Sequence, residues 1–259
     1  MPAKKPPETW FWSHDIKPTQ IASVVTPGTR LIRLSSYGAD AARRFAALVY
    51  KEPGLAGRGM PPAGSAPGGG RGSIERSYAL DLDAAALTAT LAETGARPVA
   101  ITAGVDGKLS VVLETGPGSL ASVHVELDEA ALRALSDEQH AIADLATYVR
   151  DGARKFVAIV EDRAAPSWLF TGVTAPELDA KLLEHDAALT RVRAYRDGNT
   201  TRFAAVAERG RPAGWAWYAD LDGDGVAKQL ENNAAYPIDL DATREDRGTR
   251  FTVVMVRQP

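Results

Sequence analysis

The hydrophobic pattern of this chain recurs five times, and each copy ends in a short, nearly continuous apolar run. The five runs are Arg44–Tyr50, Lys108–Glu114, Lys155–Glu161, Arg202–Glu208 and Arg250–Val256. Such runs are typical of buried β-strands. Their anchor residues Leu109, Phe156, Phe203 and Phe251 are about 47 residues apart, a period that indicates a repeat architecture.

A second strand is predicted just before each apolar run. In the clearest copy, Arg30–Tyr37 alternates apolar and polar residues and leads into the apolar run through a short polar connection. Tyr37, Tyr148 and Tyr195 each lie eight residues before the phenylalanine of their own copy. Each copy also opens on an aromatic or branched residue, for which we expect one column: Trp12, Tyr78, Val123, Trp168 and Trp217.

A helix is predicted between the opening residue and the second strand. Asp83 and Asp128 are positioned as N-caps, and Thr174 with Glu177 has the spacing of a capping box. The copy that contains Val226 and Leu230 follows the same plan. In the first copy, Pro18 limits the segment Ile16–Val25 to a short helical run. The repeated unit is therefore predicted to be β-α-β-β.

We expect an α+β repeat protein that forms a single domain over residues 1–259. The units span approximately 10–51, 77–115, 122–162, 167–209 and 214–257, and the glycine- and proline-rich stretch 52–76 is predicted to be a flexible insertion. One such unit cannot bury both faces of its sheet, so neighbouring units must stack. A propeller-like or toroidal arrangement would remove open sheet edges, and an open superhelix is the alternative.

Composition excludes several classes of protein. The net charge of −3, with basic residues spread along the chain, argues against nucleic-acid binding. No apolar run approaches the length of a membrane span, and the absence of cysteine excludes disulfides and thiolate metal sites. The N-terminal segment lacks the apolar core of a signal peptide, which predicts a cytoplasmic protein, or a secreted one if a leader has been removed. The bias toward alanine, arginine and glycine is typical of a GC-rich bacterial genome.

Three motifs carry a resemblance to a known family. Gly28–Leu31, Leu34–Tyr37 and Arg44–Leu48 are continued by Lys155–Ile159 and Arg202–Val206. Together with the opening tryptophan, this pattern resembles the bacterial tandem-repeat family, which includes the repeats ahead of the serine-hydrolase domain in polyglycine hydrolases. The resemblance implies an accessory role in binding or positioning, because the nucleophile of those hydrolases lies in a separate domain with no counterpart here.

The resemblance fails at two places. The second unit has Gly95–Pro98 where the family pattern differs, and the column tyrosine is missing in that unit and around Thr243.

One segment fits a calcium-binding loop. Asp220, Asp222, Asp224, Gly225 and Glu231 match the spacing D-x-[DN]-x-[DN]-G-x5-E, in which carboxylates at alternate positions converge on one hard cation. A strand pattern precedes the segment instead of a helix, and Ala227 replaces the usual branched apolar residue. The alternative is that the aspartates cap the fifth helix. Calcium is the one cofactor that the sequence suggests.

The recurring aromatic residues are the candidate ligand-binding residues. They are Trp12, Tyr37, Tyr148, Trp168, Tyr195 and Trp217. Large aromatic rings at equivalent positions can form stacking platforms for sugars or peptides, and the alternative is that they fill the space between neighbouring units.

We therefore expect a non-enzymatic binding or scaffold module. It would recognise a glycan, a cell-wall peptide or a protein partner on a ring face or in the central opening, and we predict no catalytic residue. The first alternative is a small-molecule enzyme with a central pocket that uses tyrosine, aspartate or glutamate side chains. The second alternative is a structural, oligomer-forming element, which an exposed apolar patch would indicate.

Overall fold

A computed structural model describes residues 6–26, 28–51, 75–115, 120–137, 139–163 and 167–258. Most of the predicted insertion 52–76 lies outside these ranges. Its last two positions, Glu75 and Arg76, already belong to a strand, so the second unit begins slightly earlier than the composition suggested.

The protein is mostly β, and it contains five similar three-stranded antiparallel sheets. The first strands are β1 (Thr9–Ile16), β4 (Glu75–Leu82), β7 (Ala121–Leu127), β10 (Ser167–Val173) and β13 (Ala216–Leu221). The second strands are β2 (Thr29–Tyr37), β5 (Arg97–Ala103), β8 (His140–Arg150), β11 (Ala187–Asp197) and β14 (Ala235–Glu245). The third strands are β3 (Arg44–Lys51), β6 (Leu109–Thr115), β9 (Ala153–Asp162), β12 (Thr200–Arg209) and β15 (Gly248–Arg257). In every sheet the third strand lies between the other two, and we number the units 1 to 5 along the chain.

A helix follows the first strand of each unit, as the pattern predicts. The helices are α1 (Ile21–Val24), α2 (Ala84–Thr94), α3 (Glu129–Ala134), α4 (Ala175–Glu184) and α5 (Gly223–Asn232). Asp83 and Asp128 accept hydrogen bonds from backbone N–H groups in the first turns of α2 and α3, both at 2.8 Å. Thr174 and Glu177 form the expected capping box of α4. The predicted caps are therefore confirmed.

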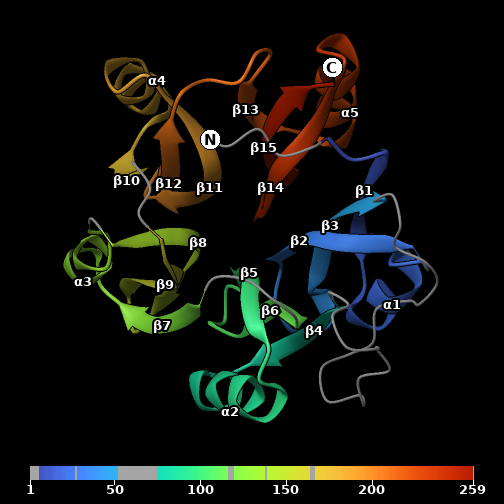
Figure 1. Cartoon of the computed structure of the whole chain (residues 1–259), viewed down its shortest axis with the longest axis vertical. Coiled ribbons are helices and arrows are strands. Elements are labelled where there is room, and N and C mark those ends of the chain that lie inside the picture. Colours follow the sequence, from blue (N-terminus) through green and yellow to red (C-terminus); the bar gives the residue numbers. More distant parts are fainter. Residues whose placement is uncertain are drawn as a thin grey trace.

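The five sheets surround a common centre, with their second strands innermost (Figure 1). β2, β5, β8, β11 and β14 contact one another in that order, and β14 also contacts β2. Each second strand has a register shift at the same place relative to its tyrosine position, which marks a β-bulge; the residues skipped are Ile32, Val99, Ala143, Thr190 and Ile238. The recurrence of this bulge shows that the units share their backbone register as well as their sequence pattern.

The hydrophobic cores lie between neighbouring units as well as within them. One core joins Tyr37 and Ala46 of unit 1 to Phe251 of unit 5. Another joins Phe156 of unit 3 to Val206 of unit 4. The units therefore depend on their neighbours for burial. None of the described helices is long and apolar enough to cross a lipid bilayer.

The junction of units 1 and 2 carries a charged cluster around Glu114. Arg30 and Arg76 each donate to Glu114 Oε2 at 2.7 Å, and Arg97 donates to Oε1. Burial alone would raise the pKa of Glu114, but Arg76 and Arg30 outweigh it and lower the pKa to about 2. This carboxylate is therefore ionised in the folded protein and ties the two units together.

Candidate functional site

The centre of the molecule is filled by charged side chains from the second strands. Arg33, Asp144, Arg193, Asp239 and Asp241 are all buried. Arg33 and Arg193 both donate to Asp144, and Arg193 Nη1 donates to Asp239 Oδ2 at 2.6 Å. Burial lowers the pKa of Arg193, but the neighbouring carboxylates outweigh it and raise the pKa above its usual value. The cluster therefore holds its charges as ion pairs.

Polar side chains of each second strand also reach the backbone of the preceding unit. Asp144 of unit 3 accepts from the N–H of Ile101 at 2.7 Å, and Asp239 of unit 5 accepts from the N–H of Val192 at 2.9 Å. Arg193 of unit 4 donates from Nε to the carbonyl of Leu145 at 2.8 Å.

The same type of bond joins the remaining pairs. Thr102 of unit 2 accepts from Ser36 N–H at 2.9 Å, and Ser35 of unit 1 accepts from Ala242 N–H of unit 5 at 2.8 Å. Every unit is thus hydrogen-bonded to the one before it, and unit 1 to unit 5.

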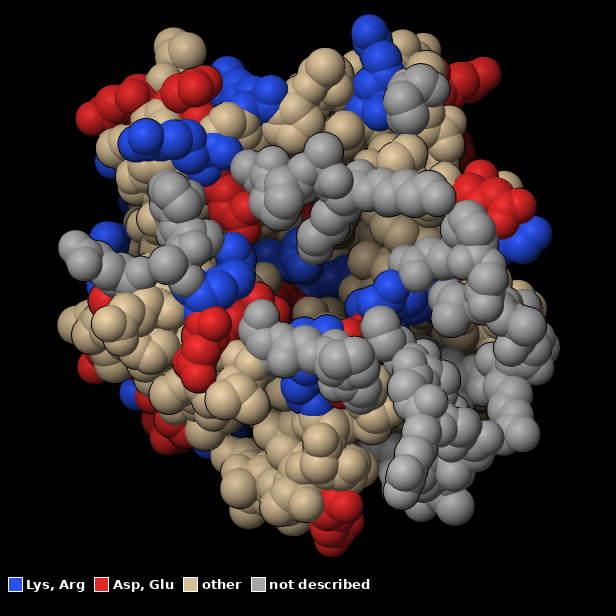
Figure 2. All heavy atoms as spheres, viewed as in Figure 1, with Lys and Arg blue, Asp and Glu red and all other residues tan. Residues whose placement is uncertain are grey.

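This arrangement leaves few accessible polar groups with which a substrate could interact at the centre. Asp144 and Asp239 have no exposed surface, and their oxygens already accept hydrogen bonds. On one face, lysine and arginine side chains gather around a hollow near the middle (Figure 2). Arg191, with 22% of its side chain exposed, lies at the accessible edge of the central cluster, 3.7 Å from Asp144. The central carboxylates therefore hold the units together.

The column tyrosines act within the fold. Tyr37 and Tyr148 are buried, and their hydroxyls donate to Asp15 Oδ1 at 2.9 Å and to Glu126 Oε1 at 2.6 Å. Burial, reinforced by these carboxylates, raises the pKa of each tyrosine to about 12. Their rings are not accessible to a ligand in this structure, which corrects their assignment as ligand-binding candidates.

The column tyrosines also lie against the backbone at the end of a first strand. The Tyr37 hydroxyl accepts from Asp15 N–H at 2.8 Å, and the hydroxyls of Tyr148 and Tyr195 lie beside the backbone of Glu126 and Gly172. These three partners all have positive φ, of 57°, 57° and 70°. The column tyrosine therefore clamps a left-handed bend in its own unit.

Two of the predicted tryptophans pack against the preceding unit. The Trp217 ring meets the Phe203 ring edge-on at 5.5 Å, and its Nε1 donates to Asp179 Oδ1 at 2.8 Å. Trp12 meets Phe251 in the same way at 5.6 Å. Both rings are partly exposed. The prediction that they fill space between units is supported, and each still presents surface to a ligand.

Trp168 does not belong to the same column. Trp12 pairs with Leu48 and Trp217 with Val254, and the corresponding partner in unit 4, Val206, pairs with Leu169. The expected column is therefore wrong by one residue at unit 4. Because side chains alternate along a strand, Trp168 points to the other face of its sheet, where it stacks on His185 at 5.0 Å.

The calcium pattern corresponds to a helix and its cap. Asp222 accepts from Gly225 N–H at 2.8 Å and so caps α5, and Asp220 pairs with Arg247. Glu231 lies in the last turn of α5, about 12 Å along the axis from its start, because a helix rises about 1.5 Å per residue. Among the described residues no three acidic or histidine side chains form a group suited to a metal ion. Asp220, Asp222, Asp224 and Glu231 are thus not brought together, and the capping alternative is confirmed.

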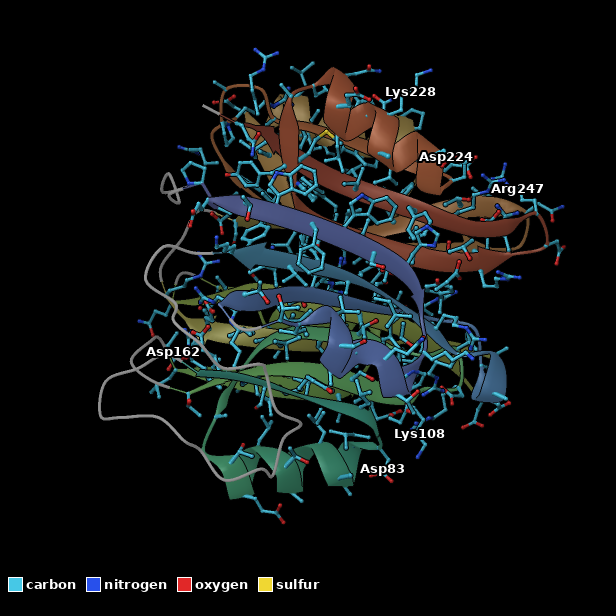
Figure 3. All side chains as sticks on the ribbon, turned by 90° about the vertical axis from the view of Figure 1, so that its right-hand side faces the viewer. Asp83, Lys108, Asp162, Asp224, Lys228 and Arg247 are labelled. Carbon is cyan, nitrogen blue, oxygen red and sulfur yellow. The ribbon has the colours of Figure 1, made fainter. Side chains whose placement is uncertain are left out.

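An open cleft with a volume of about 900 Å³ lies between units 4 and 5. We call it the junction cleft. Its walls are the start of α4, the β11–β12 hairpin, β13 and the β14–β15 hairpin. Arg247 of the β14–β15 hairpin projects on the side of the molecule opposite Asp162 (Figure 3). The residues that line it include Asp179, Arg196, Asn199, Thr201, Trp217, Asp220, Thr243, Glu245, Arg247 and Arg250.

The cleft exists because the side chains are small at two positions that face each other across the junction, one in each unit. At four junctions an arginine or a tyrosine occupies one of these positions. Arg154 covers the Tyr195 ring at 4.3 Å between units 3 and 4, and Tyr148 packs against Gly107 between units 2 and 3. The equivalent pairs at the other filled junctions are Arg43 with Gly104, and Thr249 with Tyr37.

Between units 4 and 5 both positions are threonine. Thr201 stands where unit 3 has Arg154, and Thr243 stands where unit 4 has Tyr195, because Thr243 pairs with Arg250 as Tyr195 pairs with Arg202. Two short side chains leave the space that a large one fills elsewhere. The sequence has Thr243 where the repeat predicts a tyrosine, and this departure is the sequence feature that marks the site.

The junction cleft combines the indole surfaces of Trp215 and Trp217 with opposed charges. Arg196 donates to Thr201 Oγ1 and to the carbonyl of Asn199, both at 2.9 Å. Arg247 pairs with Asp220 and with Glu245. Trp217 is held rigidly by Phe203 and Asp179. The cleft therefore offers a fixed aromatic surface beside several planar hydrogen-bonding groups.

Comparison with known proteins does not identify the chain. No family model matches it, and no characterised protein gives a significant match in sequence.

Proposed function

We propose that the five units form a closed, propeller-like ring. The support is the cyclic order of contacts among the second strands and the side-chain bonds from each unit to the one before it, including Ser35 to Ala242. In such a ring each junction is an equivalent site, and a departure at one junction creates a single binding position.

Within this ring, we propose a non-enzymatic binding module that recognises a glycan in the junction cleft. The observation that carries the proposal is the replacement of the filling pair by Thr201 and Thr243, which opens about 900 Å³ beside Trp217. This volume lies within the range of small-ligand sites, about 300 to 1,000 Å³. The central alternative has weaker support because the carboxylates there are buried and paired.

The chemistry of the cleft favours a sugar over an apolar ligand. An indole face can stack on a pyranose ring, and guanidinium, amide and hydroxyl groups such as those of Arg196, Asn199 and Thr200 can hydrogen-bond to its hydroxyls. The ring of Trp217 is held in place before binding, which reduces the entropy lost when a ligand is ordered.

The same geometry supports binding without catalysis. Each carboxylate of the cleft is already engaged: Asp179 by Trp217, and Asp220 and Glu245 by Arg247. A general acid or base must be free to exchange a proton with the substrate, and these carboxylates are occupied by other partners.

Calorimetric titration with a panel of neutral and acidic oligosaccharides and cell-wall peptides tests the proposal. We expect at least one oligosaccharide to bind and to protect the 197–200 and 245–248 hairpins from hydrogen exchange. Binding of peptides alone would overturn the glycan assignment. Protection confined to another junction, or no binding by any member of the panel, would overturn the site.

The repeat supplies a matched pair of variants. Trp217→Phe keeps the edge contact with Phe203 but shortens the aromatic surface and removes the bond to Asp179, so affinity should fall roughly threefold to tenfold. Trp12→Phe makes the same change at the equivalent position of unit 1 and should leave affinity unchanged. Equal effects of the two variants would contradict a ligand in the junction cleft.

A further inference from the structure

Arg250 differs from the other cations of the junction cleft. It lines the cleft, 19% of its side chain is exposed, and its Nε is buried. Within the described residues its guanidinium makes no hydrogen bond, and its nearest acidic atom, Asp220 Oδ1, is 3.8 Å from Nε. A largely buried guanidinium without hydrogen bonds is costly, and its more accessible terminal nitrogens are the donors that a ligand can reach.

The equivalent arginines of other units do have partners. Arg202 of unit 4 donates to the carbonyl of Gly172 at 2.6 Å and to Asp197 Oδ2 at 2.8 Å. Arg44 of unit 1 donates to the carbonyls of Ala41 and Arg43. The arginines at the equivalent positions of units 1 and 4 are thus hydrogen-bonded, whereas Arg250 has only the long ion pair with Asp220.

The charges of the cleft lead to the same conclusion. Asp220 and Glu245 are both held by Arg247, and Asp179 is held by Trp217. Arg196 already donates two hydrogen bonds within its own hairpin. Arg250 is therefore the one cation among the described residues of the cleft that neither pairs closely with a carboxylate nor hydrogen-bonds to its surroundings.

We propose that the junction cleft selects a sugar that carries a carboxylate, with Arg250 as the anchor of that carboxylate. The planar guanidinium presents paired N–H donors that match the two oxygens of a carboxylate, and a partly buried site strengthens the bond. The sugar ring then lies near Trp217, which belongs to the neighbouring strand β13 of the same sheet. This inference rests on the proposed glycan-binding function and narrows it to acidic sugars.

The test compares two ligands that differ in one charged group. Calorimetric titration uses a galacturonic acid trimer and its methyl ester, which have the same sugar rings. We expect the acid to bind at least about tenfold more tightly at low ionic strength, since hydrogen bonds to charged groups are stronger, and to lose affinity as salt is added.

Variants separate this inference from the proposed function. Arg250→Gln should reduce affinity for the acid about tenfold or more and leave affinity for the ester nearly unchanged. Arg202→Gln changes the equivalent arginine of unit 4, which does not line the cleft, and should leave both affinities unchanged.

Each outcome has a distinct meaning. Equal binding of acid and ester, both weakened by Trp217→Phe, would overturn the acidic preference while supporting glycan binding. If Arg202→Gln weakened acid binding as much as Arg250→Gln, the anchor would be wrong. If no oligosaccharide of either kind bound, the proposed function itself would fail.

Discussion

Two neighbouring junctions share the same backbone arrangement but differ in what fills them. Large side chains fill the junction between units 3 and 4, whereas the junction between units 4 and 5 is open. In the first, Arg154 lies over Tyr195, 4.3 Å from its ring centroid, and donates to the carbonyl of Arg196 at 2.9 Å. In the second, Thr201 and Thr243 face one another across an open cleft of about 900 Å³. The β-bulge and strand register are unchanged between the two junctions.

This difference teaches that a site can arise in a repeat protein by the loss of a filling side chain. The rest of the repeat preserves the walls of the cleft, because the central network and the strand register hold both units in place. Under the proposed function, ligand binding depends on the junction where the repeat pattern is broken, and not on the positions where the pattern is kept. The following predictions test this view, from the largest expected effect to the smallest.

Removing the arginine that joins the two junctions at the centre should have the largest effect. Arg193→Met removes one of the two arginines that hydrogen-bond to the buried Asp144 and the arginine that hydrogen-bonds to the buried Asp239, which should lower the free energy of unfolding by about 3–5 kcal/mol. Urea denaturation measures the change. Arg191→Met, at the more exposed edge of the same cluster, should cost less than about 1 kcal/mol. Equal costs would show that the buried network does not hold the units together.

Emptying the filled junction should be the next most costly change. Tyr195→Thr copies the unit 5 residue into unit 4 and removes both the ring beneath Arg154 and the hydroxyl beside the Gly172 backbone. We expect a loss of about 2–4 kcal/mol in the free energy of unfolding. Tyr195→Phe removes only the hydroxyl and should cost about 1 kcal/mol. A loss below about 0.5 kcal/mol for Tyr195→Thr would contradict the filling role.

The junction of units 1 and 2 should respond to acid. The pKa of Glu114 is about 2 in the folded protein, below the ordinary value of 4.5. Its stabilising contribution is therefore fully present above pH 4.5 and is lost as the pH falls toward 2. Glu114→Gln should be less stable than the wild type at pH 6, by about 1–3 kcal/mol, and the difference should shrink in urea denaturation at pH 2.5. A difference independent of pH would contradict the ion-pair account.

The helix cap of unit 5 should have a modest effect. Asp222→Ala removes the bond to Gly225 N–H and should cost about 1 kcal/mol, whereas Asp224→Ala should cost only a few tenths. Thermal denaturation should give the same midpoint with chelator and with millimolar calcium. A rise with calcium, abolished by Asp222→Ala, would restore the metal-site interpretation.

Much of the unit could be predicted from the sequence because local signals decide it. The caps at Asp83, Asp128 and Thr174 and the spacing of Tyr37 from Phe45 act over a few residues, and all appear as expected. The Trp168 column failed by one residue because two apolar residues, Trp168 and Leu169, compete for one position, and only strand pairing decides between them.

The sites that depend on contacts between units could not be predicted in the same way. Arg33 and Asp144 are 111 residues apart, and nothing local marks them as partners. Calcium was suggested because Asp220, Asp222 and Asp224 match a loop spacing, whereas the preceding strand and the length of α5 determine where Glu231 lies. Thr243 departs from the repeat in the sequence, but it opens a cleft only because Thr201 of unit 4, which faces it, is also small.

The central claim is that the paired threonines create the ligand site, and Thr243→Tyr tests it most directly. A tyrosine there should fill the cleft and clamp the backbone at Asp220, as Tyr37 clamps Asp15 and Tyr148 clamps Glu126. Titration with the oligosaccharide that binds the wild type most tightly should show at least about a tenfold loss of affinity, with an unchanged or higher melting temperature. Unchanged affinity in a folded Thr243→Tyr variant would contradict the account.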